Sequence, residues 1–374
     1  MSKADISETG TPFILYGELY TTYKEVATEI KRKTNCIVDK KYLSKIGDVV
    51  IPTSGETPEE IATATCVMTP NVILAGDLNI FRINDIDGRF FSYVINHKIN
   101  KDISRIAQGK SIVHIKGEEI SKIQIKYPSD EEQQKILSFI KLLSLKIEKQ
   151  KQLIDKLKKY KRGSLSALFP KKREITPQYR FAGFTKPWEQ RKLGDIADIV
   201  GGGTPSTGNQ SYWDGDIDWY APAEIADQIY ANSSQKKITG LGYENSSAKM
   251  LPPGTVLFTS RAGIGKTAIL TRKGCTNQGF QSIVPHRGEL DSYFIFSRTE
   301  ELKRYGELVG AGSTFVEVSG KQMAVMELMM PPTMREQQTI GGFFQQLDHL
   351  ITLHQHKYDI LLSLKNALLQ QMFI

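Results

Sequence analysis

The second half of the chain repeats the first half at an offset of 203 residues. The matched pairs are Gly109 with Gly312, Gly117 with Gly320 and Pro128 with Pro331. One inserted residue later, Gln133–Gln134 matches Gln337–Gln338, and the likeness runs on to Leu168–Pro170 and Met372–Ile374. Solenoid repeats have periods of about 20 to 50 residues. The much longer period here predicts two copies of one globular domain, each followed by a helix.

The last part of each copy predicts a long helix. Apolar residues recur seven apart with a second set between them, which is typical of a heptad seam. The seam residues are Ile140, Leu143, Ile147, Gln150, Ile154 and Leu157 in the first helix, and Phe344, Leu347, Ile351, His354, Tyr358 and Leu361 in the second. About 35 residues at 1.5 Å each span about 50 Å. Since either helix alone would expose a long apolar stripe, we expect an antiparallel coiled coil. Gln150 and His354 occupy the same polar place in the seam, where they either fix the register or face water.

The chain carries a net charge of +8, and this charge is concentrated in one segment. Residues 128–173 hold 13 Lys/Arg and 5 Asp/Glu, whereas residues 1–127 carry +1 and residues 188–331 carry −2. The Lys-rich end of the first helix is either a solvated face or a contact with a nucleic-acid backbone.

Three cysteines without a C-x-x-C pair argue against a disulfide framework or a zinc site. The first ten residues have no apolar core typical of a signal peptide, and no apolar run reaches about 18 residues. We expect a cytoplasmic protein without a membrane span.

The globular part of each copy predicts short strands joined by polar loops. Apolar runs opened by glycine, "GDVVIPTS" and "GTVLFTS", and the runs "LNIFRI" and "FQSIVP" are strand candidates. Loops rich in Gly, Ser, Thr and Asn, such as "GGGTPSTGNQSYWDGD", separate them. The fold class is therefore α/β (α+β), with long surface loops of the kind that carry recognition residues.

The stretch Gly263–Thr267 resembles a phosphate-binding P-loop, but the pattern fails. A P-loop needs G-x-x-x-x-G-K-[ST], and its first glycine would be residue 260, which is Ser260. The matching stretch of the first copy, "VVIPTSGETPEEIA", has no Gly-Lys pair. The duplicated feature is thus a strand followed by a variable polar loop, and ATP binding is disfavoured.

Other catalytic patterns are also missing from the sequence. The Asn/Asp-Pro-Pro-Tyr tetrapeptide of methyltransferases is absent. A G-x-G-x-x-G loop is absent too, because Gly201–Gly203 is a bare triplet. His354 and His356 lie two apart on a predicted helix, so they face different sides and make a poor metal pair. "EELK" (Glu300–Lys303) resembles half of a nuclease motif, but no acidic partner strand accompanies it. We therefore expect no catalytic site and no metal site.

Three stretches resemble the specificity subunit of type I restriction-modification systems. They are Arg180–Ile225, which resembles the entry to a target-recognition domain, Thr276–Pro285, and Pro331–Ile351. The resemblance covers nearly the whole chain, and the duplicated architecture makes it specific. It implies two target-recognition domains separated by an antiparallel coiled coil of two long helices, with a pseudo-two-fold internal repeat. The implied parts are the first domain over residues 1–127, the first helical spacer over 128–169, a linker over 170–187, the second domain over 188–331, and the second spacer over 332–374.

The same resemblance implies the function. The chain would select a bipartite double-stranded DNA site and dock methyltransferase subunits, two of them, and restriction subunits. It would not be an enzyme itself. It would bind no cofactor, since S-adenosylmethionine, ATP and Mg would sit on the partner subunits.

Within this interpretation, polar loop side chains would read base edges, with Arg suited to guanine and Asn or Gln to adenine. The candidates in the second domain are Thr204, Ser206, Asn209, Ser260, Arg261, Lys266, Asn277 and Gln278, and those in the first are Thr53, Ser54, Glu56, Asp77 and Asn79. Purely structural roles are the alternative: Asn277 capping a turn, Thr204 an ordinary loop residue, and Asp77 holding a hairpin.

Two further alternatives remain at the sequence level. A non-catalytic assembly protein with two protein-binding globules would explain the helices, but not the divergence of the matched loops; an ATPase is the third possibility. The first copy begins at Gly10, which aligns with Gly215, so about 25 residues at the front of the second copy have no counterpart in the first, and the front of the first domain is expected to be truncated. Either the start is misassigned, or the sequence is one form of a rearranging gene.

Overall fold

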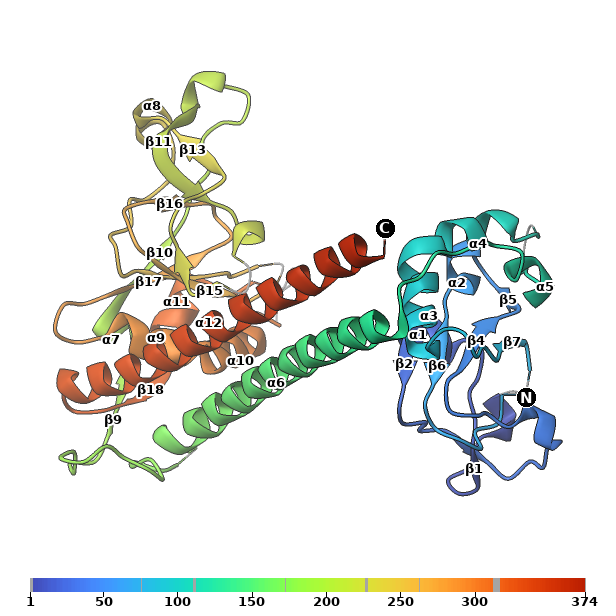
Figure 1. Ribbon diagram of the computed structural model, residues 1–374. Coiled ribbons are helices and arrows are strands. Elements are labelled where there is room, and N and C mark those ends of the chain that lie inside the picture. Colours follow the sequence, from blue (N-terminus) through green and yellow to red (C-terminus); the bar gives the residue numbers. More distant parts are fainter. Residues whose placement is uncertain are drawn as a thin grey trace. The chain divides into compact units, whose positions relative to one another are not determined.

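The computed structural model describes residues 3–74, 76–109, 112–171, 173–225, 228–261, 263–311 and 317–373. The chain forms two compact units (Figure 1). The first unit comprises Met1–Gln152 and Gln355–Ile374, and the second comprises Leu153–His354. Two unbroken helices, α6 (Asp130–Leu168) and α12 (Met334–Met372), each supply one part to either unit. The predicted mixture of helices and strands in two domains with long helices is confirmed.

The first unit is built on a four-stranded sheet in the order β2-β6-β4-β7. Its strands are β2 (Val26–Ala27), β4 (Asp48–Pro52), β6 (Thr65–Val67) and β7 (Leu78–Phe81), and two small pairs join β1 (Thr11–Pro12) to β3 (Lys33–Thr34) and β5 (Ser54–Gly55) to β8 (Val113–His114). Its other helices are α1 (Glu18–Thr21), α2 (Pro58–Ile61), α3 (Gly88–Val94), α4 (Asn100–Ile106) and α5 (Gly117–Ile120), with a π-helical turn over Ile95–Ile99 between α3 and α4 and 3₁₀ turns at Lys3–Asp5 and Lys40–Tyr42.

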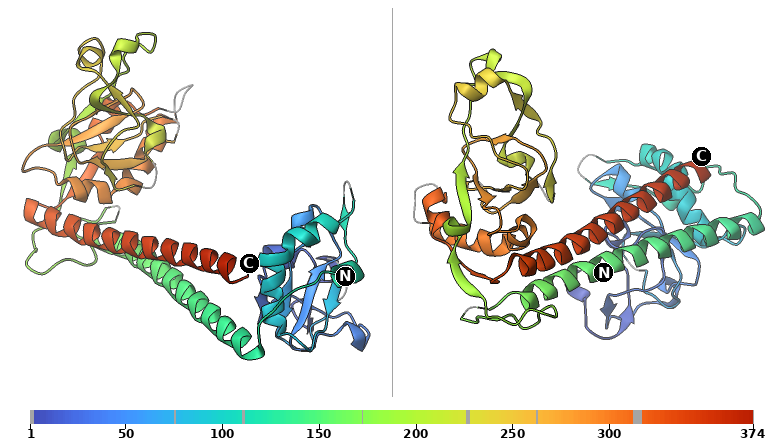
Figure 2. Two further views of the ribbon diagram at one scale, coloured as in Figure 1. Left: turned by 45° about the horizontal axis from the view of Figure 1, so that its top comes forward. Right: turned by 90° about the vertical axis from the view of Figure 1, so that its left-hand side faces the viewer.

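The second unit contains a five-stranded sheet in the order β10-β17-β14-β15-β12 and a three-stranded sheet in the order β13-β11-β16. The strands are β9 (Glu189–Lys192), β10 (Ala197–Gly201), β11 (Trp213–Tyr220), β12 (Tyr230–Ala231), β13 (Lys236–Ile238), β14 (Val256–Phe258), β15 (Thr267–Leu270), β16 (Cys275–Thr276), β17 (Gln281–Pro285) and β18 (Glu327–Met330). The helices are α7 (Leu193–Ile196), α8 (Gly240–Glu244), α9 (Ser292–Ser297), α10 (Thr299–Gly310) and α11 (Gly320–Ala324), with 3₁₀ turns at Gln210–Tyr212 and Pro222–Glu224. Within this unit α9 and α10 lie beside α12, and the three-stranded sheet lies at the opposite end (Figures 1 and 2).

The two main sheets share their strand order. Strands β2-β6-β4-β7 correspond to β12-β15-β14-β17, and each neighbouring pair has the same sense in both units, with the first pair parallel and the others antiparallel. The strands predicted from "GDVVIPTS", "LNIFRI", "GTVLFTS" and "FQSIVP" are confirmed as β4, β7, β14 and β17. Gly312, which the sequence repeat matches with Gly109, lies outside the described residues.

The matched glutamines of the repeat attach each long helix to its own globule. Buried Gln133 at the start of α6 accepts the backbone N–H of Asp87 at 3.0 Å, and Asp87 caps α3. Buried Gln337 at the start of α12 accepts the N–H of Asp291, also at 3.0 Å, and Asp291 caps α9. Both glutamines donate their amide N–H groups to backbone carbonyls, so each buried amide is satisfied from both ends.

The far end of each long helix supplies an aromatic anchor. In the second unit the Phe169 ring, just beyond α6, lies 5.4 Å from that of Phe294. In the first unit the Phe373 ring, just beyond α12, lies 5.3 Å from that of Phe90. Phe90 and Phe294 occupy equivalent places in α3 and α9, so both globules receive a helix end in the same way. Aromatic pairs of this kind contribute about 0.5–1.5 kcal/mol beyond the area that they bury.

The buried positions of the long helices include most of the predicted seam. Ile140, Ile147, Gln150, Ile154, Phe344, Leu347 and Leu361 are buried, whereas Leu143, Leu157, Ile351, His354 and Tyr358 are half-buried. The predicted linker is anchored in the second unit, because Arg180 binds both carboxylate oxygens of buried Glu336 at 2.7 and 2.8 Å. The indole N–H of Trp188 donates to the same carboxylate at 3.1 Å. The predicted domain boundaries stay predictions.

Candidate nucleic-acid interface

The Gly-Lys-Thr stretch that resembles a P-loop is the turn of a β-hairpin. It joins β14 to β15, which pair antiparallel. The Thr259 hydroxyl closes the turn: it donates to the carbonyl of Gly263 at 2.8 Å and accepts the N–H of Lys266 at 3.0 Å. Gly263 and Gly265 have φ of 102° and 93°, in the left-handed region that glycine tolerates best. A P-loop instead joins a strand to the N-terminus of a helix, so this loop presents an exposed lysine rather than a phosphate cradle.

Three loops of the second unit converge at one end of its main sheet. The N–H of Gly203 donates to the carbonyl of Thr276, and the N–H of Ser260 donates to the carbonyl of Gly279, both at 2.8 Å. The Thr204 hydroxyl donates to the Gln278 side chain. We call the segments 203–209, 259–261 and 276–279 together the loop face of the second unit. A Cβ on Gly202 would lie 2.0 Å from the carbonyl oxygen of Asn277, so glycine is required at this position for the close packing.

The predicted residues of the loop face differ in accessibility. Ser206, Asn209, Arg261 and Gln278 are exposed, and Thr204 and Asn277 are half-buried. Ser260 is fully buried at 0% exposure, which leaves its hydroxyl no surface to offer a ligand. Ser260 is therefore not proposed to contact DNA. The remaining predicted residue, Lys266, lies at the base of the adjoining hairpin turn and is exposed.

The two asparagines of this set have local structural partners. The side-chain oxygen of Asn209 accepts the N–H of Ser211 at 3.1 Å at the start of a 3₁₀ turn. The Asn277 side chain accepts the N–H of Gly279 at 2.8 Å, which is the turn-capping role considered from the sequence. These bonds orient both side chains but occupy only their oxygens.

Arg261 is the exposed cation of the loop face. Its guanidinium lies 2.8 Å from the carboxylate of Glu317, and the two side chains are 46% and 34% exposed. Glu317 was not predicted from the sequence, because it lies 56 residues downstream of Arg261. An exposed ion pair contributes little stability. The ion pair places the guanidinium beside the Glu317 carboxylate.

The five predicted residues of the first unit gather at the equivalent end of its sheet. The N–H of Thr53 donates to the carbonyl of Asp77 at 2.8 Å, which matches the bond between Ser260 and Gly279. Asp77 has φ of 49° and immediately precedes β7, and its carbonyl helps hold the strand pair. The Asn79 side-chain amide bonds within the unit: it donates to the carbonyl of Ile115 at 3.2 Å and accepts the N–H of Gly117 at 3.0 Å. Ser54 lies in β5, and Glu56 is exposed beside the capping box of α2.

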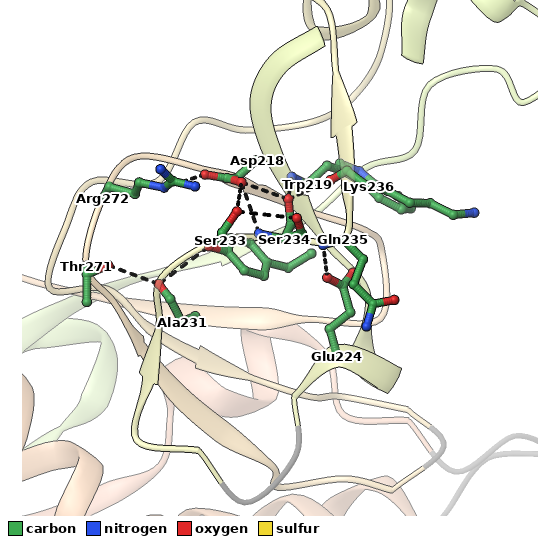
Figure 3. A network of polar contacts seen from close by, with 11 residues as sticks. Asp218, Trp219, Glu224, Ala231, Ser233, Ser234, Gln235, Lys236, Thr271 and Arg272 are labelled. Carbon is green, nitrogen blue, oxygen red and sulfur yellow. Dashed lines mark hydrogen bonds and ion pairs between the residues drawn. The ribbon is translucent and has the colours of Figure 1, made fainter. Parts of the chain in front are cut away.

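A buried carboxylate in the second unit organises a polar network that the sequence did not reveal. Asp218 in β11 is 3% exposed and accepts the N–H and the hydroxyl of Ser234, both at 3.0 Å. Arg272 approaches its other oxygen at 2.6 Å, as Figure 3 shows. Burial alone would raise the pKa of Asp218, but the hydrogen bonds from Ser234 and the charge of Arg272 outweigh it, and the net shift of the pKa is downward. The carboxylate therefore stays ionised and fixes the half-exposed guanidinium.

Two basic dipeptides flank β11 in the three-stranded sheet, one on each side of it. Lys237 pairs in register with Asp218 across β11 and β13, and Lys236 lies over the Trp213 ring at 5.9 Å. Arg272 and Lys273 lie just before β16, which pairs on the other side of β11. The only sequence signals are the dipeptides Lys236–Lys237 and Arg272–Lys273, which lie 36 residues apart. Four cations around one sheet suit contact with a phosphate backbone.

The described residues contain no cluster of three or more His, Cys, Asp or Glu side chains that could hold a metal ion. In the same part of the chain, no helix is both long and apolar enough to cross a membrane.

Sequence comparison identifies the two copies directly. The model of the type I restriction modification DNA specificity domain matches residues 1–159 and again residues 185–362. The type I restriction enzyme MjaIX specificity subunit of Methanocaldococcus jannaschii is 35% identical over 192 residues, which cover 50% of this chain and 44% of that protein. The specificity subunit of EcoR124I/EcoR124II from Escherichia coli is 26% identical over 170 residues, 43% of this chain and 41% of that protein. The chain thus matches less than half the length of these two relatives. A protein of M. jannaschii named for the MjaX specificity subunit matches over 76% of its length at 24% identity.

Solved structures share the fold. The S subunit of a type I restriction-modification system from M. genitalium aligns with a TM-score of 0.61 at 13% identity, over 100% of this chain and 91% of that chain. The HsdS subunit from Thermoanaerobacter tengcongensis aligns with a TM-score of 0.51 at 16% identity, over 99% of this chain and 93% of that chain. With the family model matched over both halves, the chain belongs to the family defined by the type I restriction modification DNA specificity domain.

Proposed function

We propose that this chain is the DNA sequence-specificity subunit of a type I restriction-modification complex, acting in the cytoplasm. The observation that carries the proposal is the double match of one DNA specificity domain to residues 1–159 and 185–362. Each globule would read one half of a bipartite double-stranded site. The chain would supply recognition and not catalysis.

Base recognition is assigned to the loop ends of the two main sheets. In the second unit, Arg261, Gln278, Thr204, Ser206 and Asn209 would face the bases, with Asn277 and Lys266 beside them. In the first unit, Thr53, Ser54, Glu56 and Asp77 would do so, while Asn79 mainly supports the loop. The cations of the three-stranded sheet would hold the phosphate backbone. Base edges give specificity and phosphates give position, so the two sets have separate roles.

The long helices are proposed to form an antiparallel coiled coil that relates the globules by a pseudo-two-fold axis. The start of α6 and the end of α12 contribute Ile140 and Phe373 to the core of the first unit. The end of α6 contributes Leu168 and the start of α12 contributes Phe344 to the core of the second. Opposite helix ends thus share each core, as an antiparallel pair requires. The helices would act as a ruler that leaves unread base pairs between the half-sites.

The proposed partners are two methyltransferase subunits and, in a complete system, restriction subunits. One structural relative is described in terms of complex assembly and conformational transition of a type I restriction-modification system. S-adenosylmethionine, ATP and Mg²⁺ would bind those partners, and this chain would carry no cofactor.

The function is tested by co-expressing the chain with a methyltransferase subunit encoded beside it. The proposal predicts adenine methylation that depends on this chain and is lost when it is omitted. Methylation of the same sites without the chain would instead support the assembly-protein alternative. ATP turnover by the purified chain alone would contradict the non-catalytic role.

A further inference from the structure

The first unit leaves uncovered a sheet edge that is covered in the second. In the second unit, β10 pairs antiparallel with β17 from Ala197 opposite Pro285 to Gly201 opposite Gln281. β7 is the counterpart of β17, because Val49 pairs with Phe81 just as Val256 pairs with Ile283. Among the described residues of the first unit, no strand lies on the outer side of β7.

The backbone of that outer side is oriented for pairing. The N–H of Thr53 donates to the carbonyl of Asp77, so by strand alternation residues 77, 79 and 81 face β4. The N–H and C=O groups of Leu78, Ile80 and Arg82 therefore point away from β4, where β17 carries its bonds to β10. An edge of this kind is a template for an added strand.

A second pairing is missing beside the first. In the second unit, β18 pairs with β9, and its Leu328 and Met330 are 1% and 3% exposed. The matching residues of the first unit, 124–127, form no strand. There Ile125 is only half-buried and Tyr127 is 44% exposed.

Between these two edges runs a groove of about 490 Å³. Its lining includes residues 79–83 on one side and Gly117, Ser121, Ile123 and Ile125 on the other. In the second unit the equivalent space is filled by α7 and β10, whose Leu193, Ile196 and Ala197 are at most 1% exposed. Only glycine fits at position 194, because an added Cβ would lie 2.9 Å from the Cβ of Ala324. Ala324 is the counterpart of Ser121 in the first unit.

We propose that this groove binds a strand–turn–strand segment of a separate polypeptide with the residue pattern of Trp188–Gly201. One strand would add antiparallel to β7 and the other to residues 124–127. The segment would carry glycine at the place of Gly194 and apolar residues at those of Leu193, Ile196 and Ala197. The chain's own Trp188–Gly201 segment is already paired with β17 and β18, so it is not the occupant. The inference concerns a protein-binding site and does not depend on the DNA-binding proposal.

A labelled synthetic peptide with the sequence of residues 187–203 provides the probe. Added to the full-length chain without DNA, it should bind saturably, and amide hydrogen exchange should slow at least tenfold in residues 78–83 and 123–127. A Val200→Pro peptide should bind at least tenfold more weakly, because proline removes the N–H that faces β7. A scrambled peptide of the same composition is the control.

A pair of chain variants locates the site. Ser121→Leu should abolish peptide binding by filling the space where Gly194 would lie. Lys122→Leu, an equally exposed neighbour outside the groove lining, should bind the peptide normally, and both variants should melt at the temperature of the wild-type chain. The proposal is overturned by equal binding of the scrambled peptide, by protection elsewhere, or by no binding. It is also overturned if the chain dimerises with residues 78–83 already protected, since a second copy would then fill the groove.

Discussion

Arg261 combines exposure with a fixed direction on the loop face. Glu317 holds its guanidinium at 2.8 Å, and the strand-end bond between Ser260 and Gly279 fixes its backbone. Such a guanidinium suits a guanine edge, where a bidentate pair contributes about 1–3 kcal/mol of discrimination. At the residue scale this makes Arg261 the best single test of base recognition.

We expect Arg261→Ala to relax one base of one half-site by about 5- to 150-fold, which is that energy expressed as a ratio. The other half-site should be unchanged. The measurement is the methylation motif of the co-expressed complex. Arg287→Ala, which removes an exposed arginine from the turn after β17, is the matched control and should leave the motif intact. An unaltered motif in Arg261→Ala would remove this residue from the interface.

Asp218 allows a prediction about stability and pH. Its pKa lies below the ordinary carboxyl value, so its ionised form stabilises the fold above about pH 4. That contribution is lost as the pH falls through the folded-state pKa. Asp218→Asn should cost about 1–3 kcal/mol of unfolding free energy at pH 7, because it weakens a buried carboxylate with four donors, which are the Ser233 hydroxyl, the N–H and hydroxyl of Ser234, and the Arg272 guanidinium.

Denaturant unfolding of Asp218→Asn and wild type at pH 7 and near pH 3 provides the check. The difference between the two proteins should shrink at the lower pH. A difference that stays constant across this range would show that the carboxylate charge contributes no stability. Asp216→Asn, which alters an exposed carboxylate of the same strand, should change little at either pH.

At the scale of elements, Gln337 bonds to the N–H of Asp291 and to the carbonyl of Glu289, and we call these two bonds the clamp. The clamp explains why a glutamine recurs in both copies. Gln337→Leu would leave the N–H of Asp291 and the carbonyl of Glu289 without this partner. We expect a loss of about 1–3 kcal/mol, measured by denaturant unfolding. Gln338→Leu, the same change at the exposed neighbouring position, should be nearly neutral. Equal effects of the two substitutions would refute the clamp.

The elements also show what the sequence could and could not predict. β4, β7, β14 and β17 were predictable, because each is an apolar run bounded by turn residues. The burial of Ser260 was not, because a polar residue at a strand end faces in or out according to the register with a distant partner, here Gly279. The Asp218–Arg272 pair was equally hidden, since β11 and the turn between β15 and β16 bring together residues 54 apart. Local pattern predicts elements, whereas long-range pairing decides which polar side chains meet.

At the scale of the whole molecule, the charge distribution predicts that recognition depends on partners. The two globular segments carry only +1 and −2, so the globules alone can neutralise few phosphates. We expect weak binding of the isolated chain at physiological salt, and at least tenfold tighter binding once methyltransferase subunits are added. Gel shifts with and without those subunits test this. Tight, sequence-selective binding by the chain alone would contradict it.

The central claim is that each globule reads its own half of a split DNA site. Base-resolution mapping of methylated adenines tests it most directly, comparing the native complex with one in which residues 188–331 are replaced by the corresponding domain of another specificity subunit. The account predicts two specified segments separated by a fixed, unspecified gap, with the exchange altering one segment and leaving the other. A single uninterrupted motif, or a change in both segments, would contradict it.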